Sequence, residues 1–481
     1  MPAALRLLLG AFWLSATGVS ARFSENPEID HRRDFAEPVQ PRQSDEASDA
    51  RQSLITFADP RAKAFKVDGK KIPDGELNLL ACLWDLPFLT GVWGSALGRR
   101  TFLGGPDADF RGRERDAQVV LLENGPISWS WGQAEPTPNP WSWTQLSNML
   151  WVEQPVGTGF SQGEPTINDD NALAAQVAGF LEQFLDIFSE LKGSNFWVTG
   201  ESYAGFFVPY IANYLYENPN PDLSLKGIWM ADPSLTWDLV RTCRTHAASP
   251  TTSTATVDPV TRIVGVRPEC KIHDMILSAA QMKGAPLTTY HRERPRLAAV
   301  DAEIHLLQSV QTAINAPTMH WKTCNHAVYA DPETGELSEV DPSVPSALSV
   351  LPNVIEKSER VVIVHGLADF VLLPEGTRIL IQWVSARFIL CGGGVTFMMI
   401  IIFRFMSCRN MTWNGRQGFQ WPIEEESFLI DDMGVFGHMH TERGLTYVEM
   451  FYSGHMAPQF VPWATYQTMA YVLGKRDSPS A

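Results

Sequence analysis

The feature that most constrains this fold is a glycine–serine–glycine turn between a short apolar strand and an apolar helix. Residues 200–205 read Gly-Glu-Ser-Tyr-Ala-Gly, preceded by strand-like residues 196–199 and followed by the apolar stretch 206–216. Two glycines allow the tight strand-to-helix turn that lifts a serine hydroxyl out of a parallel sheet. The alternative is a glycine-rich surface turn with an inert serine. The flanking pattern favours the first interpretation, in which Ser202 is a nucleophile.

Apolar periodicity before this turn predicts further elements of the same sheet. Residues 148–152 form a short apolar run that predicts a buried strand. Polar residues 169–171 then offer N-caps for a helix with an apolar face that reaches Phe188, and Gly193 is expected to end it. Strand, helix and strand in succession are typical of a parallel α/β sheet.

A nucleophilic serine needs a base and a residue that orients the base, and both have candidates directly after predicted strands. Asp369 follows the apolar strand 361–364, and His455 follows the strand 445–451. Serine, aspartate and histidine in this order, each after a strand, are typical of α/β-hydrolases. We therefore predict an α/β-hydrolase fold, with a mostly parallel central sheet flanked by helices and a catalytic set that includes Ser202. Three other histidines are interpreted as surface or structural residues: His365, His438 and His440.

Composition limits the possible partners and cofactors. The 481 residues are 44% apolar, which is enough for a sizeable core, and 54 acidic against 38 basic residues give a net charge of −16. This charge argues against a nucleic-acid backbone or an anionic membrane surface as the main partner. The six cysteines have no metal-site spacing. We expect no metal and no cofactor.

The N-terminus predicts export. Residues 1–21 combine Arg6, a short apolar run and a small-residue end at Ala21, the pattern of a secretory signal peptide; the run is too short for the alternative, a membrane anchor. Residues 22–60 are polar and are expected to form a leader or flexible arm. We expect an extracellular or vacuolar protein, in which disulfides are possible and Asn410 lies in a usable glycosylation sequon.

Several longer stretches resemble the serine carboxypeptidase family, in particular its fungal secreted or vacuolar members. The matching blocks include Glu123–Pro126, Asn139–Trp143, Asn148–Ser161, Gly200–Gly205, Ala231–Ser234, Gly366–Asp369, Asn410–Trp413 and Gly454–Gln459. The block that ends at Ser161 is far more specific than a bare G-x-S-x-G. The similar blocks span most of residues 120–240 and 300–475. We expect one hydrolase domain at residues 61–481, with a cap at about 236–345, where the sequence shows no clear alternation of strands and helices.

The resemblance implies release of C-terminal amino acids from peptides and proteins through an acyl-enzyme. Ser202 would attack the carbonyl, His455 would take and return the proton, and Asp369 would hold the imidazole. The backbone N–H of Tyr203 would be one oxyanion donor.

The resemblance also implies that Glu201 and Glu123 hold the terminal carboxylate of the substrate. Two partly buried carboxyls close together raise the pKa of at least one of them, and a protonated carboxyl can donate to a carboxylate. We therefore expect an acidic optimum, with peptide binding lost before the chemistry as the pH rises.

Two departures from the family pattern put activity in question. The family's Asn-Gly-Gly-Pro-Gly-Cys-Ser-Ser segment, which supplies a second oxyanion donor, is absent from this chain. The stretch most similar to it is Leu103–Asp107, and residues 75–119 as a whole resemble nothing in the family. Loss of one oxyanion donor typically costs on the order of 10²–10³ in kcat. The missing cysteine also leaves Cys324 without the partner that the family pattern implies.

The second departure is an insert of 27 residues, 383–409, at a point where relatives run straight on. Its uncharged part, Phe388–Phe403, is too short to span a membrane and is interrupted by three glycines. We favour intron sequence read as protein, for this insert and for residues 75–119, over a genuine insertion. Two rival functions stay open: an acyltransferase that uses the same triad, and a catalytically impaired or non-catalytic secreted relative.

Overall fold

The fold is described from a computed structural model. It describes residues 57–65, 85–86, 89–90, 123–125, 127–128, 137–158, 161, 163–236, 255–257, 264–266, 318, 327–338, 341–381, 411–423 and 426–481. All of these lie in a compact unit formed by residues 54–481. The signal peptide, the six cysteines, Asn410 and residues 383–409 lie outside the described residues, as do nearly all of the leader and of residues 75–119.

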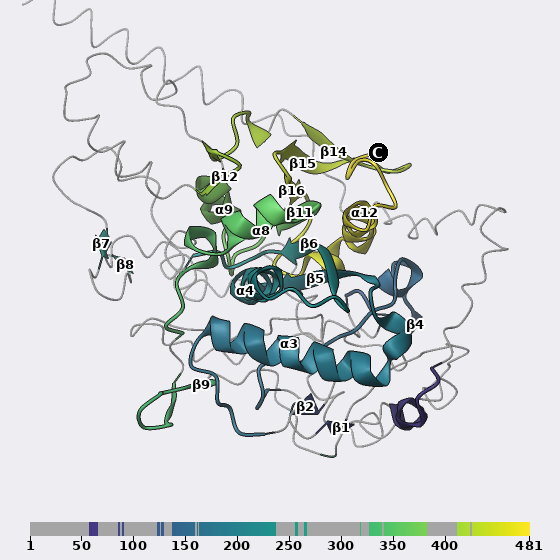
Figure 1. The fold of residues 1–481 in the computed structure, drawn as a ribbon. Helices are drawn as coiled ribbons and strands as arrows, with labels where there is room; N and C mark the ends of the chain where they lie inside the picture. Colours follow the sequence, from purple (N-terminus) through teal and green to yellow (C-terminus); the bar gives the residue numbers. More distant parts are fainter. Residues whose placement is uncertain are drawn as a thin grey trace, which may run out of the picture. The chain divides into compact units, whose positions relative to one another are not determined.

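A six-stranded sheet organises this unit, with the strand order β14-β15-β16-β11-β6-β5 (Figure 1). The strands are β5 (Asn195–Glu201), β6 (Ser224–Ala231), β11 (Arg360–Gly366), β14 (Ser427–Ile430), β15 (Gly434–Glu442) and β16 (Leu445–Met450). Strands β5, β6, β11 and β16 pair in parallel, and β15 and β14 continue the sheet antiparallel. The expected mostly parallel α/β sheet is confirmed.

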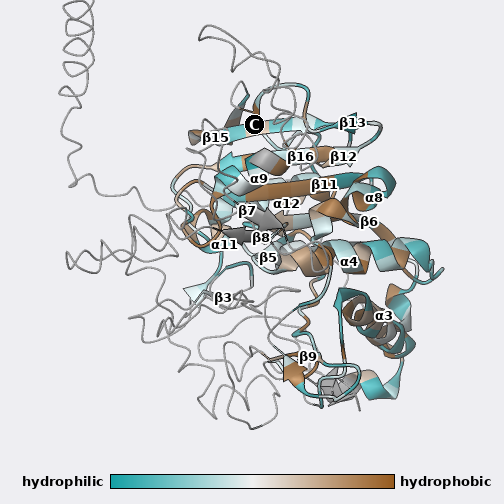
Figure 2. Ribbon diagram, turned by 90° about the vertical axis from the view of Figure 1, so that its left-hand side faces the viewer, coloured by the Kyte–Doolittle hydropathy of each residue, from teal (hydrophilic) through white to brown (hydrophobic). Residues whose placement is uncertain are grey.

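The parallel strands are apolar on both faces because helices cover both sides of the sheet. Along β11, Val361 and Ile363 belong to one buried cluster, whereas Val362 and Val364 belong to a second cluster. This alternation follows from the two-residue period of a strand. Figure 2 shows β11 as a mainly hydrophobic strand in the middle of the sheet.

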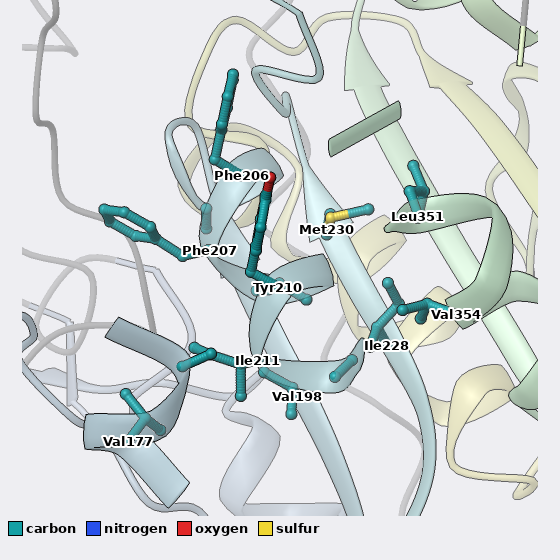
Figure 3. Packing of buried hydrophobic residues seen from close by; sticks show 14 of the residues in the cluster. Val177, Val198, Phe206, Phe207, Tyr210, Ile211, Ile228, Met230, Leu351 and Val354 are labelled. Atoms are coloured by element: carbon teal, nitrogen blue, oxygen red, sulfur yellow. The ribbon is translucent and has the colours of Figure 1, made fainter. Parts of the chain in front are cut away.

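In the described part of the chain, six helices supply the two covering layers. One face packs against α3 (Asp170–Ile187), α4 (Ala204–Glu217), α8 (Leu351–Lys357) and α9 (Pro374–Ile381). The other packs against α11 (Ala457–Phe460) and α12 (Pro462–Val472). Figure 3 shows the first layer from close by, where Ile211 of α4 and Val354 of α8 lie around the strand residues Val198, Ile228 and Met230.

Short elements fill the connections. They are η2 (Pro60–Phe65), β1 (Asp85–Leu86), β2 (Leu89–Thr90), β3 (Ile127–Ser128), β4 (Thr137–Pro138), η4 (Trp143–Gln145), η5 (Ser189–Leu191), β7 (Ala255–Val257), β8 (Val264–Val266), β9 (Tyr329–Ala330), β10 (Leu337–Ser338), η8 (Ser346–Leu348), β12 (Thr412–Trp413) and β13 (Arg416–Gln417). Among the described residues, no helix has the length and apolar character needed to cross a membrane.

Local sequence signals explain where α3 begins and ends. The side chain of Asp169 accepts a hydrogen bond from the backbone N–H of Ala172 at 2.7 Å, so Asp169 is the N-cap. The helix ends at Ile187, and Gly193 has a φ of +71° in the turn that follows η5. The predicted helix is confirmed, with its last turn replaced by η5.

The prediction of a strand at residues 148–152 is wrong, since these residues form no strand in the structure. A short apolar run occurs both in strands and in buried connections, so the run alone does not predict which of them forms. No described strand pairs with residues 148–152. Instead the indole N–H of Trp151 donates to the side-chain oxygen of Asn124 at 3.0 Å. The run therefore holds the segment around Glu123 rather than extending the sheet.

Residues on either side of the predicted insert are hydrogen-bonded to each other at the end of α9. The N–H of Met411 donates to the carbonyl of Leu380 at 2.9 Å, and the N–H of Phe419 donates to that of Ile381 at 2.6 Å. If residues 383–409 were absent, Met411 would be the fourth residue after Leu380, and the first of these bonds would be an ordinary helical i→i−4 bond.

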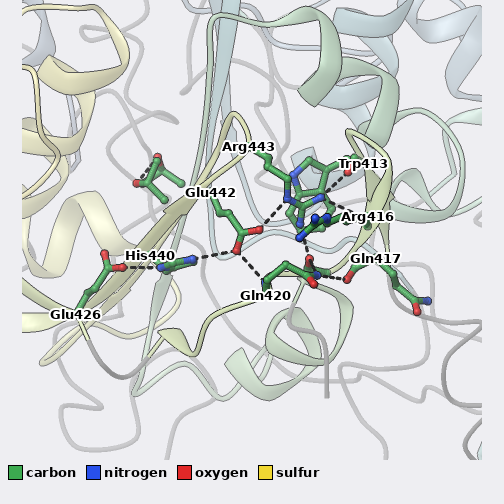
Figure 4. A network of polar contacts seen from close by, with 11 residues as sticks. Trp413, Arg416, Gln417, Gln420, Glu426, His440, Glu442 and Arg443 are labelled. Carbon is green, nitrogen blue, oxygen red and sulfur yellow. Dashed lines mark hydrogen bonds and ion pairs between the residues drawn. The ribbon is translucent and has the colours of Figure 1, made fainter. Parts of the chain in front are cut away.

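A polar network fixes the segment that follows the insert (Figure 4). The guanidinium of Arg443 stacks 4.3 Å from the ring of Trp413 and donates to the carbonyls of Trp413, Arg416 and Gly418. Its Nε donates to Glu442, which also contacts His440. The β12–β13 hairpin is therefore held against the turn between β15 and β16.

Candidate active site

The turn after β5 holds Ser202 in a strained backbone conformation. Its φ is +60°, a left-handed value that is uncommon for a residue with a side chain. The N–H of Ser202 donates to Ala231 at 3.0 Å, and its carbonyl accepts from Ser234 at 2.8 Å. A Cβ at Gly205 would lie 2.3 Å from the carbonyl oxygen of Ser234, so this glycine is required for α4 to start beside the turn.

Asp369 lies on the loop after β11, where backbone groups fix its carboxylate. Its Oδ1 accepts from the N–H of Val371 at 2.7 Å and of Leu372 at 3.1 Å. Gly366 allows this loop to approach the loop after β16, because a Cβ there would lie 2.3 Å from the carbonyl oxygen of Gly454. The carboxyl ends of β11 and β16 are thereby joined.

His455 connects the two loops. Its Nδ1 lies 2.8 Å from Oδ2 of Asp369, and its Nε2 lies 2.9 Å from Oγ of Ser202. A carboxylate can only accept, so Nδ1–H donates to Asp369 and Nε2 can accept the serine proton. The structure brings the three predicted residues into one hydrogen-bonded chain, buried within the fold.

The pKa of Asp369 supports an ionised carboxylate at this position. Burial raises this pKa, but the charge of His455 and the hydrogen bonds from His365 and His455 outweigh the burial and lower it to about 2. Asp369 therefore presents a full negative charge to His455 across the ordinary pH range.

The other two carboxyl groups predicted for the site, Glu201 and Glu123, are also buried. Glu201 is the last residue of β5 and is 8% exposed, and Glu123 is 2% exposed. The side chain of Asn139 donates to the carbonyls of Glu123 and Gly125, at 3.1 and 2.8 Å, and fixes that segment. Both carboxyl groups are thus withdrawn from bulk water.

Tyr203 begins α4 as its N-cap residue, so its backbone N–H belongs to the positive end of the helix. Its side chain points into the fold. The phenol donates to Oδ2 of Asp341 and the ring packs against Phe206 and Phe207. A second phenol, Tyr329, donates to Oδ1 of Asp170 at 2.7 Å.

Sequence reasoning missed this tyrosine–carboxyl cluster, which consists of Tyr203, Tyr329, Asp170 and Asp341. Asp170 was visible only as a candidate helix cap, and nothing in the sequence links it to Asp341. Burial raises the pKa of Asp170 well above its usual range, and the charge of Asp341 raises it further.

The three remaining candidate histidines occupy different positions. His438 is half-buried, and His440 is buried between Glu426 and Glu442, at 2.7 and 3.3 Å (Figure 4). His365 is 1% exposed, and its Nε2 lies 3.5 Å from Oδ2 of Asp369. The surface alternative is therefore wrong for His365 and His440, and sequence reasoning gave no reason to connect His365 to the site.

One group of buried side chains has the composition of a metal site. Ligand atoms of Asp232, His365 and Asp369 lie within 4.8 Å of one another. However, Nε2 of His365 lies 2.7 Å from the carbonyl of Leu372, which can only accept, so this nitrogen carries a proton and is not available to a metal. Oδ1 of Asp232 likewise accepts from Gly366 at 2.7 Å. The group fits a cluster of buried ions and hydrogen bonds better than a metal centre.

Comparisons with known proteins identify relatives of this chain. The family model described as serine carboxypeptidase matches residues 117–254 and 302–475. A protein of Arthroderma benhamiae named a probable serine carboxypeptidase is 32% identical over 435 residues, which cover 75% of each chain. Serine-type carboxypeptidase F of Aspergillus niger is 30% identical over 431 residues, 75% of this chain and 76% of its own.

A solved structure supports the fold. The crystal structure of Kex1(delta)p, a prohormone-processing carboxypeptidase from Saccharomyces cerevisiae, superimposes with a TM-score of 0.56 at 17% identity. The match covers 86% of this chain and 96% of that one. At this identity the likeness concerns the fold alone, which is the α/β-hydrolase fold that the order of the candidate residues predicts.

Proposed function

The chain belongs to the serine carboxypeptidase family, and we propose that it releases C-terminal amino acids from peptides and proteins through an acyl-enzyme on Ser202. The observation that carries the proposal is the continuous hydrogen-bonded chain from Ser202 through His455 to Asp369, at 2.9 and 2.8 Å. A nucleophile, a base and an oriented carboxylate are the parts that acyl transfer needs.

In the proposed first step, Nε2 of His455 accepts the hydroxyl proton as Oγ of Ser202 attacks the scissile carbonyl. The resulting oxyanion accepts a hydrogen bond from the backbone N–H of Tyr203. Collapse of the tetrahedral intermediate breaks the peptide bond, and the leaving amine takes the proton from His455. Asp369 remains ionised and stabilises the imidazolium that forms.

Water completes the proposed cycle. The oxygen of a water molecule attacks the acyl-enzyme while His455 accepts a proton from that water. His455 returns the proton to Oγ of Ser202 when the ester bond breaks. The shortened peptide leaves with a new C-terminal carboxylate. No metal or cofactor takes part in either half of this proposal.

Glu123 and Glu201 are the proposed carboxyl groups that select a free C-terminus. At acidic pH one of them keeps its proton and donates a hydrogen bond to the terminal carboxylate of the substrate. At higher pH both ionise and repel the substrate. Unchanged pH dependence of the peptide KM in Glu201→Gln would contradict this role.

The experiment compares a free peptide with the same peptide amidated at its C-terminus. We expect the wild type at pH 4–6 to release the last amino acid of the free peptide and to leave the amide nearly intact. Ser202→Ala should abolish release, whereas the control Ser194→Ala, at an exposed serine just before β5, should not. Release from neither peptide by the folded wild type would favour the non-catalytic relative that the missing oxyanion segment suggests, and equal use of both would favour an acyltransferase-like enzyme.

We also propose that residues 383–409 are dispensable for the fold, since the flanking residues Leu380 and Met411 make a bond that a shortened chain would make as a helical one. A deletion of 383–409 should fold with an unfolding midpoint at or above that of the full chain. A deletion variant that unfolds or aggregates would instead indicate a genuine structural insertion. Sequencing of the transcript tests the intron hypothesis separately.

The proposed location is the secretory pathway, with delivery outside the cell or to a vacuole. It rests on the signal-peptide pattern of residues 1–21 and on the sequon at Asn410. N-terminal sequencing of the exported protein should begin at Arg22, and a glycosidase should lower its mass. A chain that keeps Met1 would contradict export by cleavage.

A further inference from the structure

His365 lies behind the proposed triad and takes no part in the mechanism described so far. It is the sixth residue of β11, and its ring is buried. Its Nε2–H donates to the carbonyl of Leu372 at 2.7 Å. Its Nδ1 lies 3.2 Å from the hydroxyl of Thr377, which can donate or accept. Both ring nitrogens are therefore satisfied when the imidazole carries two protons.

Two carboxyl groups flank the same ring nitrogen. Nε2 of His365 lies 3.5 Å from Oδ2 of Asp369 and 3.8 Å from Oδ1 of Asp232. Oδ2 of Asp369 is also the oxygen that accepts from Nδ1 of His455. A positive charge on His365 would therefore act on the carboxylate oxygen that orients the proposed catalytic base.

Two other charged groups near His365, Glu449 and Arg378, compensate each other. Glu449 is the β16 partner of His365 in the sheet register, and it forms a bidentate ion pair with Arg378 of α9. Among the described residues, the titratable and charged groups on the elements around the ring include Asp232 after β6, Asp369 after β11, Glu449 and Tyr447 on β16, Arg378 on α9 and His455 after β16.

We propose that His365 is a positioning residue that, as a buried imidazolium, keeps Asp369 ionised when the enzyme works in acid. The inference rests on the proposed function, because it concerns the pH range in which Asp369 can orient His455. A buried carboxylate that faces a second carboxyl tends to take up a proton, and an adjacent cation opposes this. Nε2 of His365 lies 3.5 Å from Asp369, so a protonated His365 would be such a cation.

The electrostatic balance of the cluster agrees with this assignment. Burial alone would lower the pKa of His365, but the hydrogen bond with Asp369 and the charges of Asp232 and Asp369 raise it to about 9. Burial raises the pKa of Asp232 well above its usual range, against the opposing charge of His365. In acid the cluster therefore holds a charged His365, an ionised Asp369 and a protonated Asp232.

The variant that tests the charge is His365→Gln, because a glutamine amide can still donate to the carbonyl of Leu372. The matched control is His440→Gln, which also removes a buried histidine that lies between two carboxyl groups on the same sheet but bonds no residue of the triad. Far-ultraviolet circular dichroism and thermal unfolding first establish that both variants fold.

The readout is the rate at which a fluorophosphonate probe labels Ser202, measured from pH 3 to pH 8. This reaction uses the triad but not the proposed carboxylate-binding pair. In His365→Gln the acid limb of the rate should move to higher pH by about one unit or more, since an adjacent opposite charge typically lowers a carboxyl pKa by about 1–3 units. The rate near pH 7 should stay within about threefold of the wild type, and His440→Gln should keep the wild-type limb.

A uniform loss of rate in His365→Gln with an unmoved acid limb would overturn the proposal, because a purely structural role predicts that result. Nuclear magnetic resonance of the protein labelled with ¹⁵N-histidine gives a readout that does not need activity. One imidazolium should persist at pH 7–8 and disappear in His365→Gln, and its absence from the wild type would overturn the charge assignment. If the probe labels no wild-type chain at any pH, the proposed function fails, and the histidine spectrum still decides the charge of His365.

Discussion

Two buried carboxyl clusters lie close to the Ser202 turn, and they differ in the groups that surround the negative charge. Asp369 has histidines on both sides, at 2.8 Å for His455 and 3.5 Å for His365, and its pKa is lowered to about 2. Asp170 has the phenol of Tyr329 and a second carboxyl, and burial raises its pKa well above the usual range.

Both carboxyls are fully withdrawn from water, so burial alone does not decide whether a carboxyl group is charged. A cation beside Asp369 offsets its loss of hydration, whereas a phenol offers Asp170 one neutral hydrogen bond and no charge. The first cluster therefore supplies a fixed negative charge for chemistry. In the second cluster burial raises the pKa of Asp170, and hydrogen bonds tie Tyr203 to Asp341 and α3 to Tyr329.

The largest expected effect separates the two clusters directly. Asp369→Asn should lower the rate of Ser202 labelling by about 10⁴, because an amide no longer holds His455 in the tautomer that accepts from serine. Asp170→Asn removes an equally buried carboxyl and should leave that rate within about threefold. Similar losses in both variants, measured on folded protein, would show that the distinction between the clusters is wrong.

The next effect is the pH dependence of stability near His365. A folded-state pKa raised from 6.5 to about 9 contributes stability that is fully present below pH 6.5 and is lost as the pH rises to about 9. At about 1.4 kcal/mol per pKa unit, the loss amounts to about 3 kcal/mol. Urea unfolding between pH 6 and pH 9.5 should show this fall in the wild type, and His365→Gln should flatten it. An equal slope in both proteins would contradict a charged His365.

For the tyrosine–carboxyl cluster we expect a smaller change in the free energy of unfolding, and we expect this change not to depend on pH near neutrality. Tyr329→Phe deletes only the hydroxyl that donates to Asp170 at 2.7 Å. Leaving a buried carboxyl without this donor should cost about 1–3 kcal/mol in the free energy of unfolding. Urea unfolding at pH 5 measures the loss, with no change in Ser202 labelling expected. An unaltered unfolding free energy would mean that the phenol contributes no net stability.

The smallest effect belongs to an ion pair at the surface. Lys226 and Glu359 lie 2.8 Å apart, but the glutamate side chain is largely exposed. Water and salt screen such pairs, so Lys226→Ala should cost less than about 1 kcal/mol and should lose even that in 1 M salt. If the same urea unfolding showed a loss of free energy as large as that of a buried cluster, the claimed difference between buried and exposed charge pairs would be wrong.

The sequence allowed the sheet, its parallel core and the positions of Ser202, Asp369 and His455 to be predicted because each signal is local. An apolar strand followed by a glycine-containing loop is visible in a few residues, and the order of three such loops indicates the fold. The catalytic roles of these residues remain predictions. The strand at 148–152 was wrong because a short apolar run does not report whether a neighbouring strand pairs with it.

The clusters behind the site could not be predicted in this way. Asp170 and Asp341 are brought together by the packing of α3 against a distant loop, and His365 acquires its second carboxyl neighbour, Asp232, only when β6 and β11 pair. Charge compensation in a folded core depends on distances of 3–4 Å between residues that are over a hundred positions apart. No local pattern carries that information.

The most direct test of the central claim is the mass of the intact protein after reaction with a fluorophosphonate. The account predicts one adduct per chain, located on the peptide that contains Ser202 and absent from Ser202→Ala. A folded wild type that takes up no adduct, or a Ser202→Ala variant that is labelled to the same extent, would contradict the claim that the hydrogen-bonded chain from Ser202 through His455 to Asp369 activates this serine.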